Sequence, residues 1–365
     1  MATEHDLLDD QPAPGDQPRL VFATELDGPA LLRALRRPGV LDRLASQGWA
    51  VALLLPALDD ARAEAVRLLN EHGVGAIASL CLPPAEGFAF NLLNYPRAFE
   101  CYGAFHSWAR AHGLRFEAVG LSIEPPLEDI APDARPGALR MPRALLRRLW
   151  LARENILYPS AQTAYAELIV AIHLDGYEVY TYQMPVIADD RRAGTSLIQR
   201  ALDIVDLPSD VDVLMCSSSA PIDLLGNDLG GALIASYGAS ADAIGVGSVG
   251  DGEPGTEGHA PLPWPALRRD LLLAAEHTDT IYVYSLEDCV GRNLLPQLEQ
   301  LDWSARSRAT LRGRLLIGML RGGIFAVLVL ARFGLGALAW SGWVLAIALW
   351  LRARQRGPRE IGQEK

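Results

Sequence analysis

The sequence has few cysteines, and none of them forms a redox or zinc motif. Cys81, Cys101, Cys216 and Cys289 are widely spaced, and no CxxC pair is present. This pattern excludes a small disulfide-stapled domain and a cysteine-based metal site. We expect the four thiols to be small buried apolar side chains in a reducing, cytoplasmic setting.

Positive charge is also scarce. The chain has 33 basic and 44 acidic residues, which gives a formal net charge of −11. Nucleic-acid binding needs a basic surface, so we expect no nucleic-acid partner. The seven histidines fall in predicted helices, in loops or in the first residues of the chain, away from the strand ends. We therefore predict no metal and no other cofactor.

Three sequence motifs with known chemistry are missing. No GxGxxG follows the first predicted strand, which argues against a dinucleotide-binding domain. No GxSxG is present and Ser217–Ser219 has no strand-end histidine beside it, which argues against a serine hydrolase. The start of the chain lacks the basic stretch and apolar core of a signal peptide. We interpret residues 1–18 as a disordered tail.

Apolar residues are plentiful, at 50% of the chain, and short apolar runs alternate regularly with amphipathic helical patterns. The runs predicted as strands are Leu20–Thr24, Ala50–Leu55, Ala76–Leu80, Phe116–Ile123, Tyr177–Gln183, Val211–Cys216, Ala243–Val249 and Thr280–Leu286. The alternation of a strand with a helix is repeated eight times. It predicts an α/β fold, and specifically a (β/α)8 TIM barrel over residues 19–303. A doubly wound open sheet is the alternative.

Several helices between these strands are well marked. The clearest are Pro29–Ser46, Asp59–His72, Tyr95–His112 and Pro265–His277. Gly48, Gly73 and Gly113 follow the first three directly. Glycine at this position predicts a helix C-terminus, because glycine tolerates a positive φ.

A long apolar run lies near the C-terminus. Between Leu315 and Leu351 only Arg321 and Arg332 are charged, and basic residues stand in both flanks, 304–314 and 352–365. The run is long enough for the roughly 20 residues of a membrane span. We predict a membrane anchor over 315–351, formed by a transmembrane helical hairpin with both ends cytoplasmic. One interfacial helix followed by one span, or a buried pair of core helices, are the alternatives.

Carboxylates gather at the ends of the predicted strands, where the chemistry of a (β/α)8 barrel is placed. Glu25 and Asp27 follow the first strand, Glu124 ends the fourth, and Glu287 follows the eighth. Two carboxylates without histidine or metal suit glycoside hydrolysis, in which one acid protonates the leaving oxygen and the other attacks or activates water.

The residues are assigned as follows in this hypothesis. Glu124 is the acid/base, because the two prolines that follow it stiffen the backbone that aims it. Glu287 or Glu25 is the second carboxylate. The predicted substrate-binding residues are Tyr182, Gln183, Asn91, Asn94 and Asp27. For every one of these acids, capping of a nearby helix is the alternative interpretation.

The fourth strand resembles glycoside hydrolase family 18, the chitinase-like enzymes. In that family the strand ends in a DxxDxDxE pattern whose last glutamate is the acid, and here the four positions hold Glu117, Gly120, Ser122 and Glu124. The Ile-Glu-Pro sequence at 123–125 is similar to the Asn-Glu-Pro of many retaining glycosidases. The resemblance covers about residues 20–300 and implies a glycoside-hydrolase-like barrel.

The combined hypothesis is a membrane-anchored, glycoside-hydrolase-like barrel that acts on a sugar or glycolipid. Its expected partners are a carbohydrate or glycolipid and the lipid bilayer, with the barrel at the cytoplasmic side of the cell membrane. The alternative is a catalytically silent, membrane-tethered barrel that binds a glycan or a protein. The absence of the family acids at Gly120 and Ser122 favours this alternative.

Overall fold

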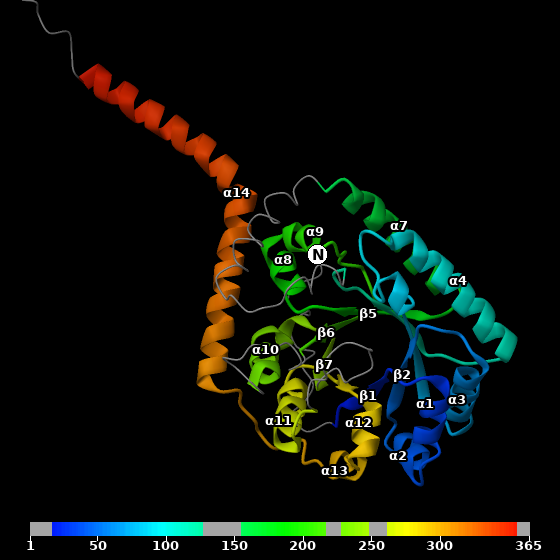
Figure 1. Ribbon diagram of the computed structural model, residues 1–365. Coiled ribbons are helices and arrows are strands. Elements are labelled where there is room, and N and C mark those ends of the chain that lie inside the picture. Colours follow the sequence, from blue (N-terminus) through cyan, green and yellow to red (C-terminus); the bar gives the residue numbers. More distant parts are fainter. Residues whose placement is uncertain (1–16, 127–154, 217–227, 248–260, 356–365) are drawn as a thin grey trace, which may run out of the picture.

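The chain closes into a barrel of eight parallel strands in a computed structural model that describes residues 17–126, 155–216, 228–247 and 261–355 (Figure 1). The strands are β1 Arg19–Thr24, β2 Ala50–Leu55, β3 Gly75–Leu80, β4 Ala118–Ser122, β5 Glu178–Gln183, β6 Val211–Met215, β7 Ala243–Gly247 and β8 Thr280–Tyr284. Neighbours along the chain pair in order, and β1 pairs with β8 to close the barrel. The predicted (β/α)8 barrel is confirmed, and closure excludes the open sheet.

Helices surround the strands. They are α1 Gly28–Leu35, α2 Val40–Ser46, α3 Asp60–Glu71, α4 Tyr95–His112, α7 Leu157–Leu174, α8 Ile187–Ala193, α9 Leu197–Ala201, α10 Leu229–Tyr237, α11 Trp264–Ala275, α12 Leu286–Gly291, α13 Leu295–Glu299 and α14 Leu311–Gln355, with short 3-10 turns at Pro84–Glu86 and Gly238–Ser240. The three glycines predicted as helix ends, Gly48, Gly73 and Gly113, have positive φ and confirm that prediction. The predicted helix Pro29–Ser46 is instead two helices, because Gly39 between them has φ 75°.

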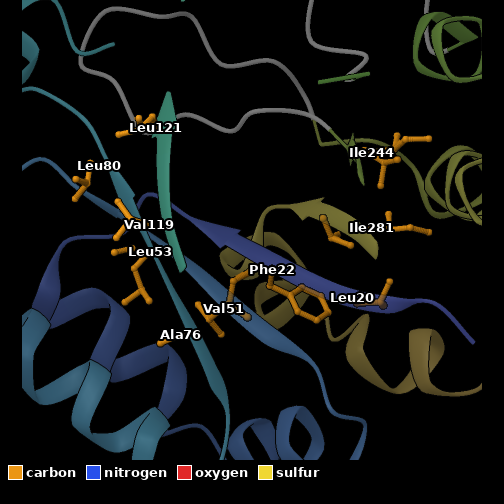
Figure 2. Close-up of a cluster of buried hydrophobic side chains, with 14 of the residues drawn as sticks. Leu20, Phe22, Val51, Leu53, Ala76, Leu80, Val119, Leu121, Ile244 and Ile281 are labelled. Carbon is orange, nitrogen blue, oxygen red and sulfur yellow. The ribbon is translucent and has the colours of Figure 1, made fainter. Parts of the chain in front are cut away.

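The strands bury both faces. One set of alternate side chains points toward the helical layer, and Figure 2 shows Leu20, Phe22, Val51 and Leu53 among them. These side chains and the apolar faces of the helices form the main core. This arrangement explains why the strands are almost continuously apolar.

The other set of side chains fills the inside of the barrel, where tyrosines oppose very small residues. Tyr182 on β5 and Tyr282 on β8 are buried there with ring centroids 5.5 Å apart. Gly120 on β4 makes room for the first ring, because a Cβ at this position would lie 2.5 Å from a carbon of Tyr182. Alanines at interior positions of β1, β2, β4 and β7 complete the packing.

The C-terminal apolar segment is one helix and not the predicted hairpin. α14 runs without a turn from Leu311 to Gln355. Its N-terminal half lies along the barrel against α8 and α10, and its C-terminal half leads away from the barrel (Figure 1). Within the described part of the chain, Leu311–Phe333 is long and apolar enough to cross a membrane, and Ser341–Arg352 is a shorter apolar stretch.

An ion pair holds the N-terminal half of α14 on the barrel. The Nε of Arg321 lies 3.0 Å from a carboxylate oxygen of Asp189, which is fully buried in the first turn of α8. The other oxygen of Asp189 accepts the hydroxyl of Tyr237 at 2.7 Å, and the Arg321 guanidinium stacks 3.8 Å above that ring. Removing one partner of a buried pair costs about 3–5 kcal/mol, so this contact fixes the helix in place.

We predict that Gly120→Ala destabilises the barrel by about 1–3 kcal/mol, because the added methyl group overlaps the Tyr182 ring. The free energy of unfolding in urea measures the effect. The control is Gly103→Ala in α4, where a Cβ meets nothing within 4 Å. This control should stabilise the protein by about 0.5–1 kcal/mol. Equal effects at the two positions would show that the Tyr182 ring does not restrict position 120.

Candidate functional site

Two of the predicted carboxylate residues meet where β1 and β8 end. The backbone N–H of Glu25 donates to Oε1 of Glu287 at 3.3 Å. The two strands are neighbours in the closed barrel, so residues far apart in the sequence become adjacent at this edge. The contact also fixes the orientation of the Glu287 carboxylate, because one of its oxygens is tied to the backbone of the next strand.

Glu124 lies just beyond β4 on a backbone that is held from both sides. The N–H of Glu124 donates to the carbonyl of Phe90 at 3.2 Å, and the N–H of Ile123 donates to the carbonyl of Tyr182 at 3.2 Å. Phe90 itself forms a parallel bridge with Ile123. In strand alternation, Glu124 is in the same row as Ser122 and Gly120, which face the inside of the barrel.

Tyr284, at the end of β8, links the acids of β1 and β4 electrostatically. Burial, together with the negative charges of Glu124 and Glu25, raises the pKa of the Tyr284 phenol well above its usual value. The phenol therefore stays protonated at neutral pH and is available as a hydrogen-bond donor. Glu25 and Glu124 follow the C-terminal ends of β1 and β4, and all strands of the closed barrel are parallel, so both residues lie at the same mouth.

Glu287 lies at the start of a helix, and one of its carboxylate oxygens makes no hydrogen bond to the described residues. It lies in the first turn of α12, which Ser285 caps by accepting the N–H of Asp288 at 3.4 Å. This is the helix-start position considered for it from the sequence. Its Oε2 is buried and has no hydrogen-bond partner among the residues that the structure describes. A buried carboxylate oxygen without a partner is costly, and such groups concentrate at functional sites.

Tyr182 lies beneath the mouth as part of the barrel interior. Its side chain is 4% exposed, and its hydroxyl lies 2.9 Å from Oγ of Ser79 on β3. Burial raises the pKa of Tyr182 to about 12, so the phenol is neutral. It forms part of the floor of the barrel, below the level at which the strands end.

Gln183 points away from the mouth. It is 1% exposed, and its amide nitrogen donates to Thr181 at 3.2 Å and to Asp206 at 3.4 Å. Because Tyr182 faces inward, its neighbour in the strand must face the helical layer. The structure thus separates Gln183 from the other predicted substrate-binding residues.

Asn91 and Asn94 shape the loop after β3 through their own side chains. Oδ1 of Asn94 accepts the N–H of Asn91 at 2.8 Å, and its amide nitrogen donates to the carbonyl of Ala89 at 2.8 Å. Oδ1 of Asn91 accepts the N–H of Leu93 at 2.9 Å. The side-chain amides of Asn91 and Asn94 therefore stabilise the turn after β3.

Asp27 caps a helix, as the alternative interpretation from the sequence allowed. Its carboxylate accepts the N–H of Ala30 at 2.7 Å at the start of α1. An N-cap carboxylate satisfies one of the free N–H groups of the first turn. The Asp27 carboxylate therefore serves as the N-cap of α1. Glu25, two residues earlier, lies at the mouth.

Two other positions of the family pattern, 117 and 120, do not reach the mouth. Glu117 precedes β4, at the opposite end of the strand from Glu124, and pairs with Arg19 at 2.6 Å. Gly120 is filled by the ring of Tyr182, as described above. The Ser217–Ser219 run lies outside the described residues.

The sequence reasoning missed Tyr282 and Tyr284. The eighth strand reads Thr-Ile-Tyr-Val-Tyr, and its two tyrosines are two residues apart. Side chains two apart on a strand share one face, so this spacing could have placed both on the inside of the barrel. The structure puts Tyr282 in the interior, and Tyr284, the last residue of β8, is half-buried and packs against the same cluster.

The similarities to known proteins are at the level of the fold. No protein-family model matches the chain, and no curated protein matches it. A GH18 chitinase from Pseudoalteromonas aurantia is 9% identical, with 78% of this chain and 100% of that chain covered and a TM-score of 0.43. The PgaB (BpsB) glycoside hydrolase domain from Bordetella bronchiseptica is 15% identical, with 78% and 98% covered and a TM-score of 0.44.

A third solved structure has a different chemistry. The family 2 AP endonuclease from Brucella melitensis is 14% identical, with 74% of this chain and 93% of that chain covered and a TM-score of 0.36. These likenesses are distant, and the barrel assignment rests on the strand pairing of this chain itself. One fold serves many reactions, so function is argued from the site.

We predict that Ser79 and Tyr182 are energetically coupled. Ser79→Ala and Tyr182→Phe should each cost about 1–3 kcal/mol, because each leaves a buried hydroxyl without this partner. The double variant should cost less than the sum by about 1 kcal/mol, since both changes remove the same bond. Urea unfolding of the four proteins measures this coupling. Strictly additive costs would contradict the role of Tyr182 as a floor residue held by Ser79.

Proposed function

We propose that this barrel acts on a sugar or glycolipid by two-carboxylate chemistry, with Glu124 as the acid/base. The observation that carries the proposal is that Glu25, Glu124 and Glu287 all follow C-terminal strand ends of one closed parallel barrel, with the N–H of Glu25 bonded to Glu287. A hydrolase of this kind needs one carboxylic acid at the leaving oxygen and one carboxylate on the other side of the bond. The backbone bonds on both sides of Glu124 supply the rigid placement that such an acid requires.

Glu287 is the stronger candidate for the second carboxylate. Oε1 is oriented by the N–H of Glu25, and the buried Oε2 lacks a partner among the described residues. A carboxylate in this state can stabilise positive charge that develops on a sugar ring, or attack it. Tyr284, which stays protonated, can donate a hydrogen bond to a carboxylate or to a sugar hydroxyl.

The membrane part of the proposal rests on α14. The helix contains an uncharged apolar stretch over 333–351, and arginines flank the apolar run on both sides. We infer that residues within 315–351 anchor the barrel in the cell membrane, with the barrel on the cytoplasmic side, where basic flanks are favoured. A glycolipid substrate in the same membrane would then be within reach of the barrel.

A catalytically silent, glycan-binding or protein-binding barrel is the second candidate. One observation favours it: the ring of Tyr182 fills the space at Gly120, where the family pattern has an acid. The mouth would then offer carboxylates and a phenol for hydrogen bonds to sugar hydroxyls without cleavage.

The first test is Glu124→Gln. Turnover of any active member of a panel of disaccharides and alkyl glycosides should fall by at least about 100-fold, because their leaving alcohol needs the proton that the amide cannot donate. The control is Glu117→Gln, which changes a carboxylate on the same segment at the opposite end of the barrel and should leave turnover unchanged. Turnover that survives in Glu124→Gln would refute the assignment. A wild-type chain that binds glycans but cleaves none would support the silent barrel.

The second test distinguishes the two other acids. Glu287→Gln keeps an oxygen that can accept the N–H of Glu25, so the fold should persist while turnover falls by about 100-fold or more. Glu25→Gln should lower turnover by less than about tenfold if Glu25 only adjusts the field around Tyr284. Steady-state kinetics with the same glycoside measures both changes. A larger loss in Glu25→Gln than in Glu287→Gln would reverse the assignment.

A further inference from the structure

The N-terminal half of α14, residues 311–333, has two different faces. The face toward the barrel carries Ile317 and Leu328, which are buried, and Arg321, whose charge is paired with Asp189. The opposite face exposes large apolar side chains. They are Leu311, Leu315, Met319, Leu320, Val327, Leu330 and Phe333. An apolar stripe of this length, about 34 Å along the helix, is unusual on a surface that meets only water.

The exposed stripe continues into the part of α14 that leaves the barrel. There Trp343, Val344, Ile347 and Trp350 are exposed. Exposed apolar side chains therefore stand on both halves of one continuous helix, at 311–333 and at 343–350. Continuity with the proposed membrane anchor identifies a lipid bilayer as the occupant of the stripe.

The charges on the two faces agree with this orientation. If residues 311–333 spanned the membrane, Arg321 would lie near the centre of the bilayer. Asp189, which is fully buried, would then lose its counter-ion. The docked helix avoids both costs, because the barrel supplies the counter-ion. A helix with one apolar face and one face on a protein suits the plane of the membrane surface.

Basic side chains cluster where α14 begins. Arg306, Arg308, Arg312 and Arg314 are exposed, and none has an ion-pair partner in the part of the chain that the structure describes. Asp228, which contacts the residue just before α14, is already bound by Arg269 at 2.9 Å and by the hydroxyl of Thr310. These arginines complement the negative surface of a bilayer with anionic lipids.

A cavity of about 280 Å³ opens beside these arginines, between α10 and α14. It is lined by Ala232, Ala235, Ser236, Leu311, Arg314 and Leu315. The guanidinium of Arg314 suits a phosphate, and the two leucines belong to the exposed stripe. The cavity thus offers a cation beside apolar side chains, as a phospholipid headgroup and its acyl chains require.

We infer that the barrel lies side-on on the membrane: the outer face of 311–333 rests in the interface of an anionic bilayer, and the α10–α14 cavity holds a phospholipid phosphate at Arg314. The following half of α14 enters the membrane. This inference rests on the proposed membrane anchor and adds the face, the orientation and the lipid class to it. The strength of such membrane binding increases with the apolar area that is buried in the interface and with the electrostatic attraction to anionic lipids.

The orientation is tested on the full chain in proteoliposomes with one fluorescent label at a time. Cys101, the half-buried native thiol, is replaced by serine, and single cysteines are placed at Met319, Leu330, Trp343 and Ser107, where Ser107 is an exposed control in α4. Labels at 319, 330 and 343 should be quenched by nitroxide lipids, and the label at 107 by aqueous iodide.

The two ways to fail differ. If the labels at 319 and 330 behave like the one at 107 while 343 is quenched by lipid, the side-on orientation is wrong and the anchor stands. The same result would follow if a second copy or another protein covered the stripe. If the label at 343 is also in water, the anchor itself is wrong.

The phosphate site is tested with a label at Leu315, which lines the cavity. Acyl-chain nitroxide phosphatidylglycerol should quench it about fivefold more effectively than the matched phosphatidylcholine, as expected for about 1 kcal/mol per arginine near an anionic surface. Arg314→Gln should abolish this preference, while Arg312→Gln, the neighbouring exposed arginine outside the cavity lining, should retain most of it. Equal quenching by the two lipids, or equal losses in the two variants, would overturn the assignment of the cavity.

Discussion

The inside of the barrel depends on one steric match, between large tyrosines on β5 and β8 and very small residues on the other strands. The ring of Tyr182 uses the space that Gly120 leaves, and Tyr282 packs against it at 5.5 Å. A closed eight-stranded barrel has an interior just wide enough for side chains to fill it. Here the filled interior becomes a floor, and Glu25, Glu124 and Glu287 follow the strand ends above it.

The acids above this floor are held by backbone contacts. Glu124 and Ile123 are bonded to Phe90 and to the end of β5, and Glu287 is bonded to the chain after β1. On the outside of the barrel, by contrast, a side-chain ion pair does the positioning. The ion pair between Asp189 and Arg321 joins α8 to α14, so that the N-terminal half of this apolar helix packs in the helical layer around the barrel.

Local patterns predicted the strands and helix ends well, because apolar alternation and capping glycines act over a few residues. The side-chain roles were harder. Tyr182 and Gln183 are adjacent in a strand, so only one of them can face the mouth, and the sequence pattern alone did not show which. The hairpin prediction failed for a different reason: the partner of Arg321 lies 132 positions away, so the sequence around Arg321 carries no sign of a buried counter-ion.

The continuous helix α14 has a consequence for how the barrel would find its substrate. Since no turn separates the docked half from the half that leaves the barrel, the mouth has a set direction relative to the apolar half. If the apolar half enters a membrane as proposed, the barrel would move only in the plane of that membrane. A substrate carried in that plane would be met at a high effective concentration, whereas a freely diffusing one would gain little.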